Sequence, residues 1–336
     1  MKYIITLDTG TTNTRTILWN EKREIVSMRK AAVGVRNTAI DGNNSRLKKA
    51  VRACLEGLLS DAGISYEDIF SIIASGMITS NVGLVEIPHC TAPAGIDDLA
   101  EAVQAVKIPE VCPLPIHFIP GIKNNVPHVT VENVECMDIM RGEEVEACPM
   151  IQKYADGSPL LLVLPGSHMK FISVDPGGRM TGCLTSISGE LLASITNHTI
   201  IADAVGHKFV EESDYDQRMI LEGYRNSLAQ GLGRACFSGR ILSQFVTENK
   251  VQIANYILGA VLACDIQAVK NSRAIRTASD MKVIVGGKNP LRRAILELLK
   301  YDGYFAGVVE FVPEGEVPLS AIGAYMIADR RKALEK

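Results

Sequence analysis

Residues 3–19 read YIITLDTGTTNTRTILW, and this stretch decides the fold. An apolar run at 3–7 leads into the turn-rich break Thr9-Gly10-Thr11-Thr12-Asn13, and the chain then alternates over 15–19. This pattern predicts two strands joined by a tight turn, with a third strand expected near 24–28. The chain is therefore predicted to open with three strands, and the first turn between them is polar and carries a glycine.

Strands and helices alternate beyond this hairpin. Residues 47–59 place apolar side chains at helical spacing, and residues 97–106 are predicted as a helix with Asp97 as its N-cap. Short apolar runs at 69–74 and 116–119 are predicted as strands. Alternation of this kind is typical of an α/β domain.

The pattern starts again near residue 160. Strands are predicted at 160–164, 170–174 and 180–187, and aligning Gly10 with Gly166 lays them over those of the N-terminus, which indicates a duplication. The other predicted elements are helices at 188–197, 214–229, 236–247, 250–271, 290–299 and 319–334 and strands at 281–285 and 308–312. We predict two α/β lobes, 1–145 and 146–336, with the option that residues 319–334 pack back on the first lobe.

Composition excludes several classes of protein. The 336 residues carry a formal net charge of -3, which offers no broad electrostatic footprint for nucleic acid or an anionic membrane. The longest apolar run, residues 256–264, is too short to cross a bilayer, and no signal peptide is recognised, so we expect a cytoplasmic protein. The eight cysteines are scattered and form no CxxC pair, which argues against zinc, and a disulfide framework is not expected in a chain this long without an export signal.

The first turn has residues that can form a phosphate-binding site. The Asp8 carboxylate at a strand end can hold Mg²⁺, directly or through water, and Gly10 lets the backbone approach a phosphate closely. Backbone N–H groups and hydroxyls over Thr11, Thr12 and Asn13 can bind phosphate oxygens. The alternative is a polar hairpin in which Thr and Gly serve only turn formation.

The second turn, Pro165-Gly166-Ser167-His168, again places a glycine beside a hydroxyl residue between two predicted strands. Lys170 adds a cation nearby. Two such hairpins, one in each lobe, would grip opposite sides of a triphosphate tail, so we expect Gly10 and Gly166 to face one cavity. A lysine in a strand can instead point to solvent, and a lone histidine such as His168 is more often a partly buried structural residue.

Between the hairpins, Arg141-Gly142-Glu143-Glu144 enters a predicted helix. Glu143 and Glu144 would be stabilised by the helix N-terminus, and one of them can act as the base that accepts a hydroxyl proton during phosphoryl transfer. Arg141 can bind a substrate carboxylate or pair with Glu144. Helix-start stabilisation and solvated charge are the structural alternatives.

Two glycine-bearing strand ends are further candidates. Ser80 and Asn81 follow a strand end, where open α/β sheets place ligands, and can bind sugar hydroxyls or serve a turn. Gly286-Gly287 stands between a predicted strand and helix, which suits close approach to a nucleotide but also a plain turn.

Taken together, these segments resemble the 2-dehydro-3-deoxygalactonokinase family, within the actin/hexokinase/heat-shock ATPase superfamily, over nearly the whole chain. The most specific strings are MRGEE and PGSHxK. The residues that carry the likeness are Asp8-x-Gly10-x-Thr12-Asn13-x-Arg15, Gly76-Met77-x-x-Ser80-Asn81-x-Gly83, Pro120-Gly121, Met140-Arg141-Gly142-Glu143-Glu144, Pro165-Gly166-Ser167-His168-x-Lys170, Ser188-Gly189-Glu190-Leu191, His198 and Gly286-Gly287.

The resemblance implies two tandem ribonuclease-H-like lobes of the actin/hexokinase type with a cleft between them. It also implies ATP- and Mg²⁺-dependent phosphorylation of the terminal hydroxyl of 2-dehydro-3-deoxy-D-galactonate, in galactonate catabolism. On this view the two hairpins hold the ATP phosphates and Mg²⁺, Gly286-Gly287 lines the adenosine pocket, and Glu144 or else Glu143 is the base. The sugar-acid side would comprise Ser80, Asn81, Gly121 and Arg141.

Two rival functions remain open. An exopolyphosphatase-type phosphatase would release phosphate from polyphosphate without any sugar. A non-catalytic, nucleotide-dependent regulatory module would bind nucleotide without turnover over a panel of sugar acids. The expected partners are a small sugar acid and ATP, with no nucleic acid and no membrane, and a homodimer is left open.

Overall fold

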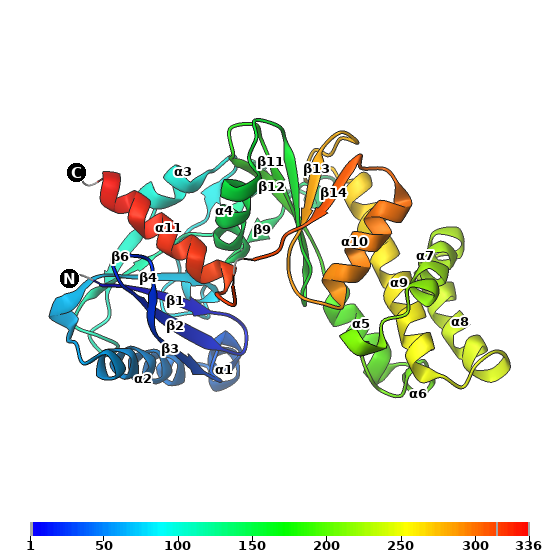
Figure 1. Cartoon of the computed structure of the whole chain (residues 1–336), viewed down its shortest axis with the longest axis horizontal. Coiled ribbons are helices and arrows are strands. Elements are labelled where there is room, and N and C mark those ends of the chain that lie inside the picture. Colours follow the sequence, from blue (N-terminus) through cyan, green and yellow to red (C-terminus); the bar gives the residue numbers. More distant parts are fainter. Residues whose placement is uncertain (1–2, 314, 335–336) are drawn as a thin grey trace.

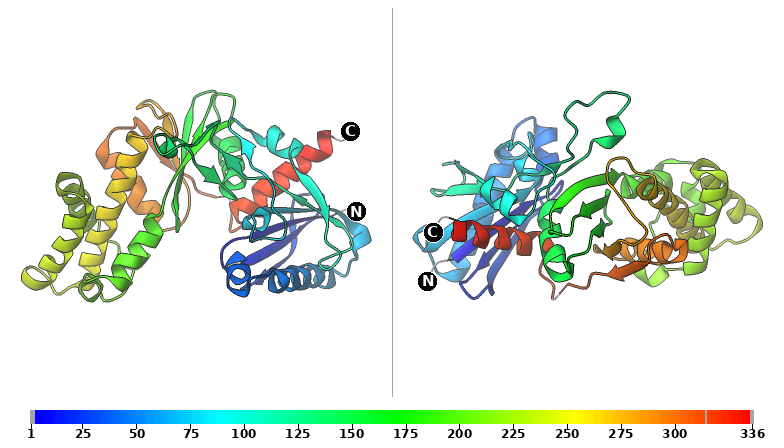
Figure 2. Two further views of the ribbon diagram at one scale, coloured as in Figure 1. Left: turned by 180° about the vertical axis from the view of Figure 1, so that it is seen from behind. Right: turned by 90° about the horizontal axis from the view of Figure 1, so that it is seen from above.

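The computed structural model describes residues 3–313 and 315–334. Two lobes stand side by side, each built on its own sheet, with the N-terminal sheet at the left of Figure 1 and the helices of residues 188–302 at the right. Both termini lie on the first lobe, because the last helix returns to it (Figure 2). The chain thus crosses from the first lobe to the second and back again.

The first sheet has the strand order β3-β2-β1-β4-β7-β6. β1 pairs antiparallel with β2 and parallel with β4, so the apolar run after Lys2 lies at the sheet centre. The strands are β1 (Tyr3–Thr9), β2 (Thr14–Trp19), β3 (Ile25–Ala31), β4 (Ile69–Gly76), β6 (Gln104–Lys107) and β7 (Pro115–Phe118).

The second sheet repeats this order as β12-β11-β10-β13-β14. β10 pairs antiparallel with β11 and parallel with β13, as β1 does with β2 and β4. The strands are β10 (Leu160–Leu164), β11 (Met169–Val174), β12 (Met180–Ser186), β13 (Lys282–Val285) and β14 (Gly307–Glu310). The predicted repeat of the strand pattern is confirmed, and the fold consists of two α/β lobes.

Helices cover the outer faces of both sheets. In the first lobe they are α1 (Val35–Asp41) and α2 (Ser45–Ala62), whereas α3 (Ile96–Glu101) packs into the inner core. In the second lobe they are α5 (Ser188–His198), α6 (Ala202–Val205), α7 (Gln217–Gln230), α8 (Leu232–Phe245), α9 (Lys250–Lys270) and α10 (Leu291–Asp302). Of the described helices, α9 is the one long and apolar enough to span a membrane, but most of it is buried inside the second lobe, as expected for a core helix.

Two further helices lie between the sheets. α4 (Glu143–Tyr154) and α11 (Leu319–Leu334) pack on each other, and α11 also contacts α3 and β1. One hydrophobic core joins them to the inner faces of both sheets, with Ile73 of β4 and Leu162 of β10 in the same cluster. The lobes therefore share a core at this junction, because each sheet needs its inner apolar face covered.

The predicted helix over 97–106 is partly wrong. Its helical part ends at Glu101, and Gln104–Lys107 forms β6, which pairs antiparallel with β7. The reason is tertiary: β7 would otherwise present an open sheet edge, and pairing satisfies its backbone groups. A small sheet of β5 (Cys90–Thr91), β8 (Ile122–Lys123) and β9 (Ile139–Met140) was also not predicted.

Candidate active site

The first hairpin is fixed from behind by the start of α1. Its turn closes with a hydrogen bond from the Gly10 N–H to the Asn13 carbonyl, at 2.9 Å. The N–H groups of Val35 and Arg36 donate to the carbonyls of Gly10 and Thr11. A Cβ on Gly34 would lie 2.5 Å from the Thr11 carbonyl oxygen, so glycine permits this close approach. Thr11 and Thr12 are left exposed at the tip, and Asn13 donates from Nδ2 to the Thr12 hydroxyl.

The second hairpin is held between two other segments. The Glu190 N–H at the start of α5 donates to the Ser167 carbonyl, and His168 Nε2 lies 3.1 Å from Glu190 Oε1. On the other side, Gly287 has φ +82° and approaches Pro165 so closely that a Cβ would lie 2.9 Å from its carbonyl oxygen. Ser167 and His168 are exposed at the tip, as Thr11 and Thr12 are in the first hairpin.

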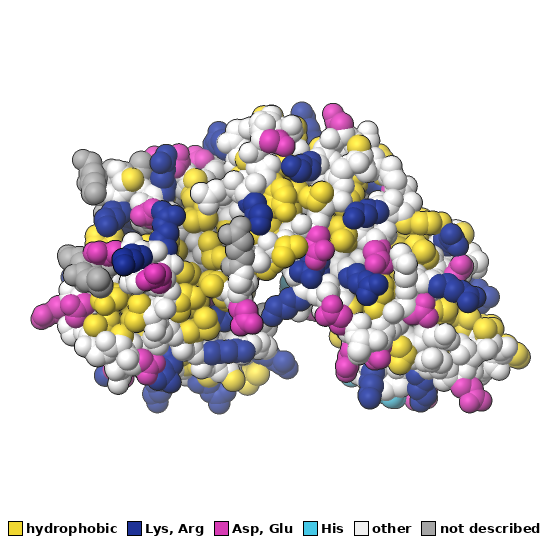
Figure 3. Space-filling model, viewed as in Figure 1, with side chains coloured by type: hydrophobic (Ala, Val, Ile, Leu, Met, Phe, Trp, Pro, Cys, Tyr) yellow, Lys and Arg dark blue, Asp and Glu magenta, His cyan; other side chains and the backbone are white. Residues whose placement is uncertain are grey.

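A cavity of about 780 Å³ lies between the lobes. Asp8 and Arg15 of the first hairpin strands line one wall, and Gly287 and Lys288 of the second lobe line the other. Gly10 and Gly166 are not among the residues that line it, so the expectation that both glycines face this cavity is not met. Figure 3 shows the surface notched between the two halves, with Lys and Arg side chains around the notch.

Sequence reasoning missed an acidic residue in this cavity, Glu146. Burial, reinforced by repulsion from Asp8 and Glu143, raises the pKa of Glu146 to about 8. Burial also raises the pKa of Asp8, whose carboxylate accepts a 3.4 Å hydrogen bond from the Ser320 hydroxyl of α11. The spacing of the glutamates could have identified Glu146 from the sequence. Glu143 and Glu146 are three residues apart in α4 and so lie on the same face of the helix.

The two predicted base candidates have different surroundings. The Glu144 side chain is fully buried and accepts from the Gly142 N–H, and burial raises its pKa to about 8. The Glu143 side chain keeps 29% exposure, accepts from the Arg141 N–H at 3.0 Å, and lies 4.0 Å from Lys170 Nζ. Only Glu143 of this pair is open to a substrate.

Lys170 does not point to solvent but crosses from the second lobe to the first. Its ammonium is buried and donates to the Ile139 carbonyl at 2.8 Å and to the Thr185 hydroxyl. Asp138 accepts from the Thr185 backbone N–H and hydroxyl beside it. Because removing a charge from water costs several kcal/mol, these partners are what make a buried ammonium tolerable here. Lys170 is thus a junction between the lobes, with Glu143 as its nearest carboxylate.

The predicted sugar-acid residues gather around one loop. Arg141 donates from Nη1 to the Thr79 carbonyl and from Nη2 to the Ile87 carbonyl, so its guanidinium holds the loop after β4 and is not free as a carboxylate ligand. It forms no ion pair with Glu144 among the described residues. The Ser80 hydroxyl donates to the Met77 carbonyl, whereas Asn81 is exposed.

Backbone contacts connect this loop to the acidic residues. A Cβ on Gly76 would lie 2.9 Å from Asp8 Oδ1, and a Cβ on Gly142 would lie 3.3 Å from Gly76 Cα. The N-terminus of α4 therefore reaches the strand end that carries Asp8. Gly121 is buried directly before β8 of the adjacent small sheet, where a Cβ would lie 2.4 Å from the Met140 carbonyl oxygen and 2.7 Å from the His89 ring.

The two predicted adenosine-side glycines differ. Gly287 lines the cavity, whereas Gly286 is buried against Leu164 and Met150 and contributes to packing. Lys288, which was not predicted, lines the same cavity and is exposed.

The donor set in the cavity fits a hard divalent cation. Asp8 and Glu146 offer carboxylate oxygens, and no set of three His, Cys, Asp or Glu side chains converges on a metal position among the described residues. Mg²⁺ is commonly held by one or two carboxylates together with substrate phosphates and waters, which is compatible with this pair.

Comparisons with known proteins agree with this geometry. Residues 8–311 match the family described as 2-keto-3-deoxy-galactonokinase. A probable 2-dehydro-3-deoxygalactonokinase of Rhizobium meliloti is 28% identical over 60% of this chain, and the match spans 59% of that protein, less than two thirds of its length. The 2-dehydro-3-deoxygalactonokinase of Escherichia coli is 24% identical over 80% of each chain.

A solved structure shows the same fold. It comes from Sinorhizobium meliloti, from a protein named as a candidate 2-dehydro-3-deoxygalactonokinase, and superposes with a TM-score of 0.73 at 19% identity over 99% of this chain and 97% of that one. Because the family match covers nearly all of the sequence, including both hairpins and the Glu143–Glu146 helix start, this chain belongs to the 2-keto-3-deoxy-galactonokinase family.

Proposed function

We propose that this chain is an ATP-dependent carbohydrate kinase that phosphorylates the terminal 6-hydroxyl of a 2-dehydro-3-deoxy sugar acid, 2-dehydro-3-deoxy-D-galactonate. The observation that carries the proposal is one cavity lined from both lobes, by Asp8 on one wall and Gly287 on the other. Family membership and the names of the relatives support the choice of substrate.

The nucleotide would lie along the second-lobe wall. Gly287, which has no side chain to block the approach, would face the adenosine, and Lys288 and Arg15 supply positive charge for the phosphates. The two hairpin tips, over Gly10–Asn13 and Gly166–His168, would offer N–H groups and hydroxyls from opposite sides. Asp8 and Glu146 would hold Mg²⁺, which when bound neutralises phosphate charge.

The hydroxyl acceptor would lie on the first-lobe side, next to the start of α4. Glu143 is the base in this proposal, because it is accessible and Glu144 is not. The substrate oxygen bonds to the γ-phosphorus while the bond from that phosphorus to the β–γ bridging oxygen breaks. ADP leaves with the bridging oxygen, and Glu143 accepts the hydroxyl proton.

The Ser80–Asn81 turn would face the sugar hydroxyls, with Arg141 holding its loop in place. We also propose the division into lobes 1–145 and 146–336, a cytoplasmic location, a role in galactonate catabolism, and sugar acid and ATP as the partners. Nucleic acid and membrane have no part in this proposal.

The direct test is an assay of ADP formation with ATP and Mg²⁺ over 2-keto-3-deoxy sugar acids and plain sugars. We expect turnover with 2-dehydro-3-deoxy-D-galactonate, and ³¹P NMR should place the new phosphate on the terminal hydroxyl. Phosphate release from polyphosphate without any sugar would instead indicate a phosphatase. Nucleotide binding with no turnover on any sugar acid would indicate a regulatory module.

A matched pair of variants tests the base. Glu143→Gln should lower kcat on the order of 10²- to 10⁴-fold with little change in ATP binding. Glu144→Gln, one residue away but buried, should retain most of the turnover. Wild-type turnover in Glu143→Gln would remove this residue from the role, and loss confined to Glu144→Gln would assign the role to Glu144.

A further inference from the structure

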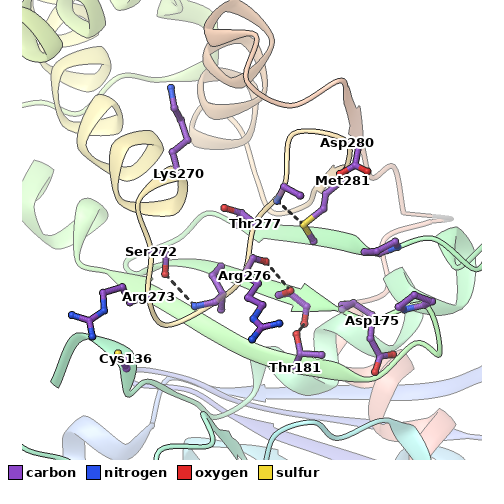
Figure 4. A pocket seen from close by; sticks show the side chains of 16 residues that line it. Cys136, Asp175, Thr181, Lys270, Ser272, Arg273, Arg276, Thr277, Asp280 and Met281 are labelled. Atoms are coloured by element: carbon purple, nitrogen blue, oxygen red, sulfur yellow. Dashed lines mark hydrogen bonds between the residues drawn. The ribbon is translucent and has the colours of Figure 1, made fainter. Parts of the chain in front are cut away.

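A second cavity, of about 950 Å³, lies in the second lobe at the edge of the sheet away from the interlobe site (Figure 4). Pro159 and Met281, which precede the parallel strands β10 and β13, line it. Gly166 and Gly286 follow the same two strands at their other ends. The cavity is therefore separated from the proposed active site by the length of the sheet.

The first lobe also contributes to this cavity. Cys136, from the segment between β8 and β9, lines it, and the neighbouring Glu135 pairs with Arg273 at 2.6 Å. Asn124 of the same segment is buried and donates from Nδ2 to the Ala274 carbonyl at 3.1 Å. The loop over residues 271–281 is thus fixed against the first lobe, which gives the cavity a defined wall.

Positive charge in the cavity is only partly neutralised. Lys270 pairs with Asp302, and Arg273 pairs with Glu135. Among the described residues, Arg276 has no ion pair, and in Figure 4 its side chain points toward the strand that carries Thr181.

The two acids that line the cavity do not neutralise Arg276. The Asp175 carboxylate accepts the N–H groups of Gly177 and Arg179 in its own turn. Asp280 lies at the far end of the loop (Figure 4). A guanidinium in a recess, without a carboxylate of its own, is suited to a planar or tetrahedral oxyanion.

Part of the lining next to these cations is apolar. Val174, Ile275 and Met281 are buried side chains that line the cavity. The volume matches that of sites for small metabolites, which combine an apolar lining with a few polar groups. A bare ion would fill little of a cavity of about 950 Å³, so the ligand should carry a short carbon skeleton as well as its charge.

We infer that this cavity binds a small metabolite that carries a phosphate or carboxylate group, with the oxyanion on Arg276 and the carbon skeleton on the apolar wall. The site is separate from the proposed kinase site, and binding to it does not depend on catalysis. Phosphate and carboxylate share the chemistry that Arg276 recognises, so the experiment has to distinguish them.

The experiment is isothermal titration calorimetry on the full chain at constant ionic strength with three probes: glycerol 3-phosphate, malate and inorganic phosphate. We expect glycerol 3-phosphate or malate to bind once per chain, more tightly than inorganic phosphate. Arg276→Ala should weaken that binding at least tenfold, about the value of one charge-assisted hydrogen bond. Its thermal midpoint should stay unchanged, because the Arg276 side chain is exposed.

Lys288→Ala is the matched control, because it removes a cation from the interlobe cavity instead. It should leave the binding of the organic probes unchanged. The inference is overturned if none of the probes binds the wild type, if Arg276→Ala binds as tightly as the wild type, or if Lys288→Ala alone abolishes binding. None of these outcomes bears on sugar-acid phosphorylation, which is measured separately.

Discussion

The two glycine-bearing hairpins occupy matching places in two sheets of the same strand order, yet they carry different chemistry. In the first, Asp8 lies opposite Arg15 in the strand register, and both line the interlobe cavity. In the second, Leu164 lies opposite Lys170. The cation is kept in both hairpins, whereas the carboxylate stands only in the first. The repeated strand order thus places a carboxylate at the interlobe cavity in one lobe and a buried link between lobes in the other.

The same contrast holds on the outer faces. The first sheet is covered by α2, whereas the second supports the larger helical layer of α5 to α10. The inner faces share a single core through α4 and α11. Matching strands therefore set where the site lies, and the unmatched helices and side chains set what each lobe contributes to it.

The largest effect is expected from removing the Asp8 carboxylate, which has no counterpart in the second hairpin. Asp8→Asn should lower turnover on the order of 10³-fold, because the carboxylate proposed to hold Mg²⁺ is lost. The thermal midpoint should stay the same or rise, since a desolvated charge is replaced by a neutral amide. The measurement is the initial rate of ADP formation beside a melting curve, with Asp203→Asn, whose side chain is 91% exposed, as the control. Near-wild-type turnover would mean that the two hairpins are equivalent.

The shared core can be tested at the contact between α4 and α11. A Cβ on Gly323 of α11 would lie 1.9 Å from the Val145 carbonyl oxygen of α4. Gly323→Ala should therefore lower the free energy of unfolding by about 3 kcal/mol, measured by urea denaturation. Gly233→Ala in the outer helix α8 meets nothing within 4 Å and should raise it by about 0.5–1 kcal/mol. Equal effects would show that the junction helices are no more tightly packed than the outer layer.

The matched cations provide a smaller test. Lys170→Met leaves the Ile139 carbonyl without its donor and should destabilise the protein by about 1–3 kcal/mol. Arg15→Met should change the thermal midpoint little, because Arg15 is only partly buried and borders the cavity. Differential scanning calorimetry compares the thermal midpoints of the two variants. If Arg15→Met is the more damaging, the assignment of Lys170 as the junction is wrong.

The smallest expected effect concerns pH. The pKa of the Glu144 carboxyl is raised from 4.5 to about 8, chiefly by burial, so the folded protein binds its proton more tightly than the unfolded chain does. The stabilisation is fully present below about pH 4.5 and is lost as the pH rises through about 8. The free energy of unfolding should fall more steeply from pH 5 to 9 in the wild type than in Glu144→Gln, by a difference of about 1–2 kcal/mol, measured by urea denaturation. Parallel curves would contradict the assigned pKa.

Much of the fold could be predicted from the sequence because it rests on local patterns. The hairpin at residues 3–19, the restart near residue 160 and the helix over 250–271 are each marked by apolar periodicity and by turn residues that act over a few positions. The edge strand β6 could not be predicted, because residues 104–107 become a strand only beside the free edge of β7.

For the site, the sequence by itself determined the residue types and their order: an acid before one glycine turn, a cation after each, and a pair of glutamates at a helix start. Tertiary structure decided their burial and their partners. It buried Glu144, left Glu143 open, tied Arg141 to its own loop, turned Lys170 toward the other lobe, and brought Glu146 to Asp8. The physical reason is that the protonation and accessibility of a side chain depend on its burial and on contacts with segments far away in the sequence. The spacing of residues along one strand does not reveal either of these.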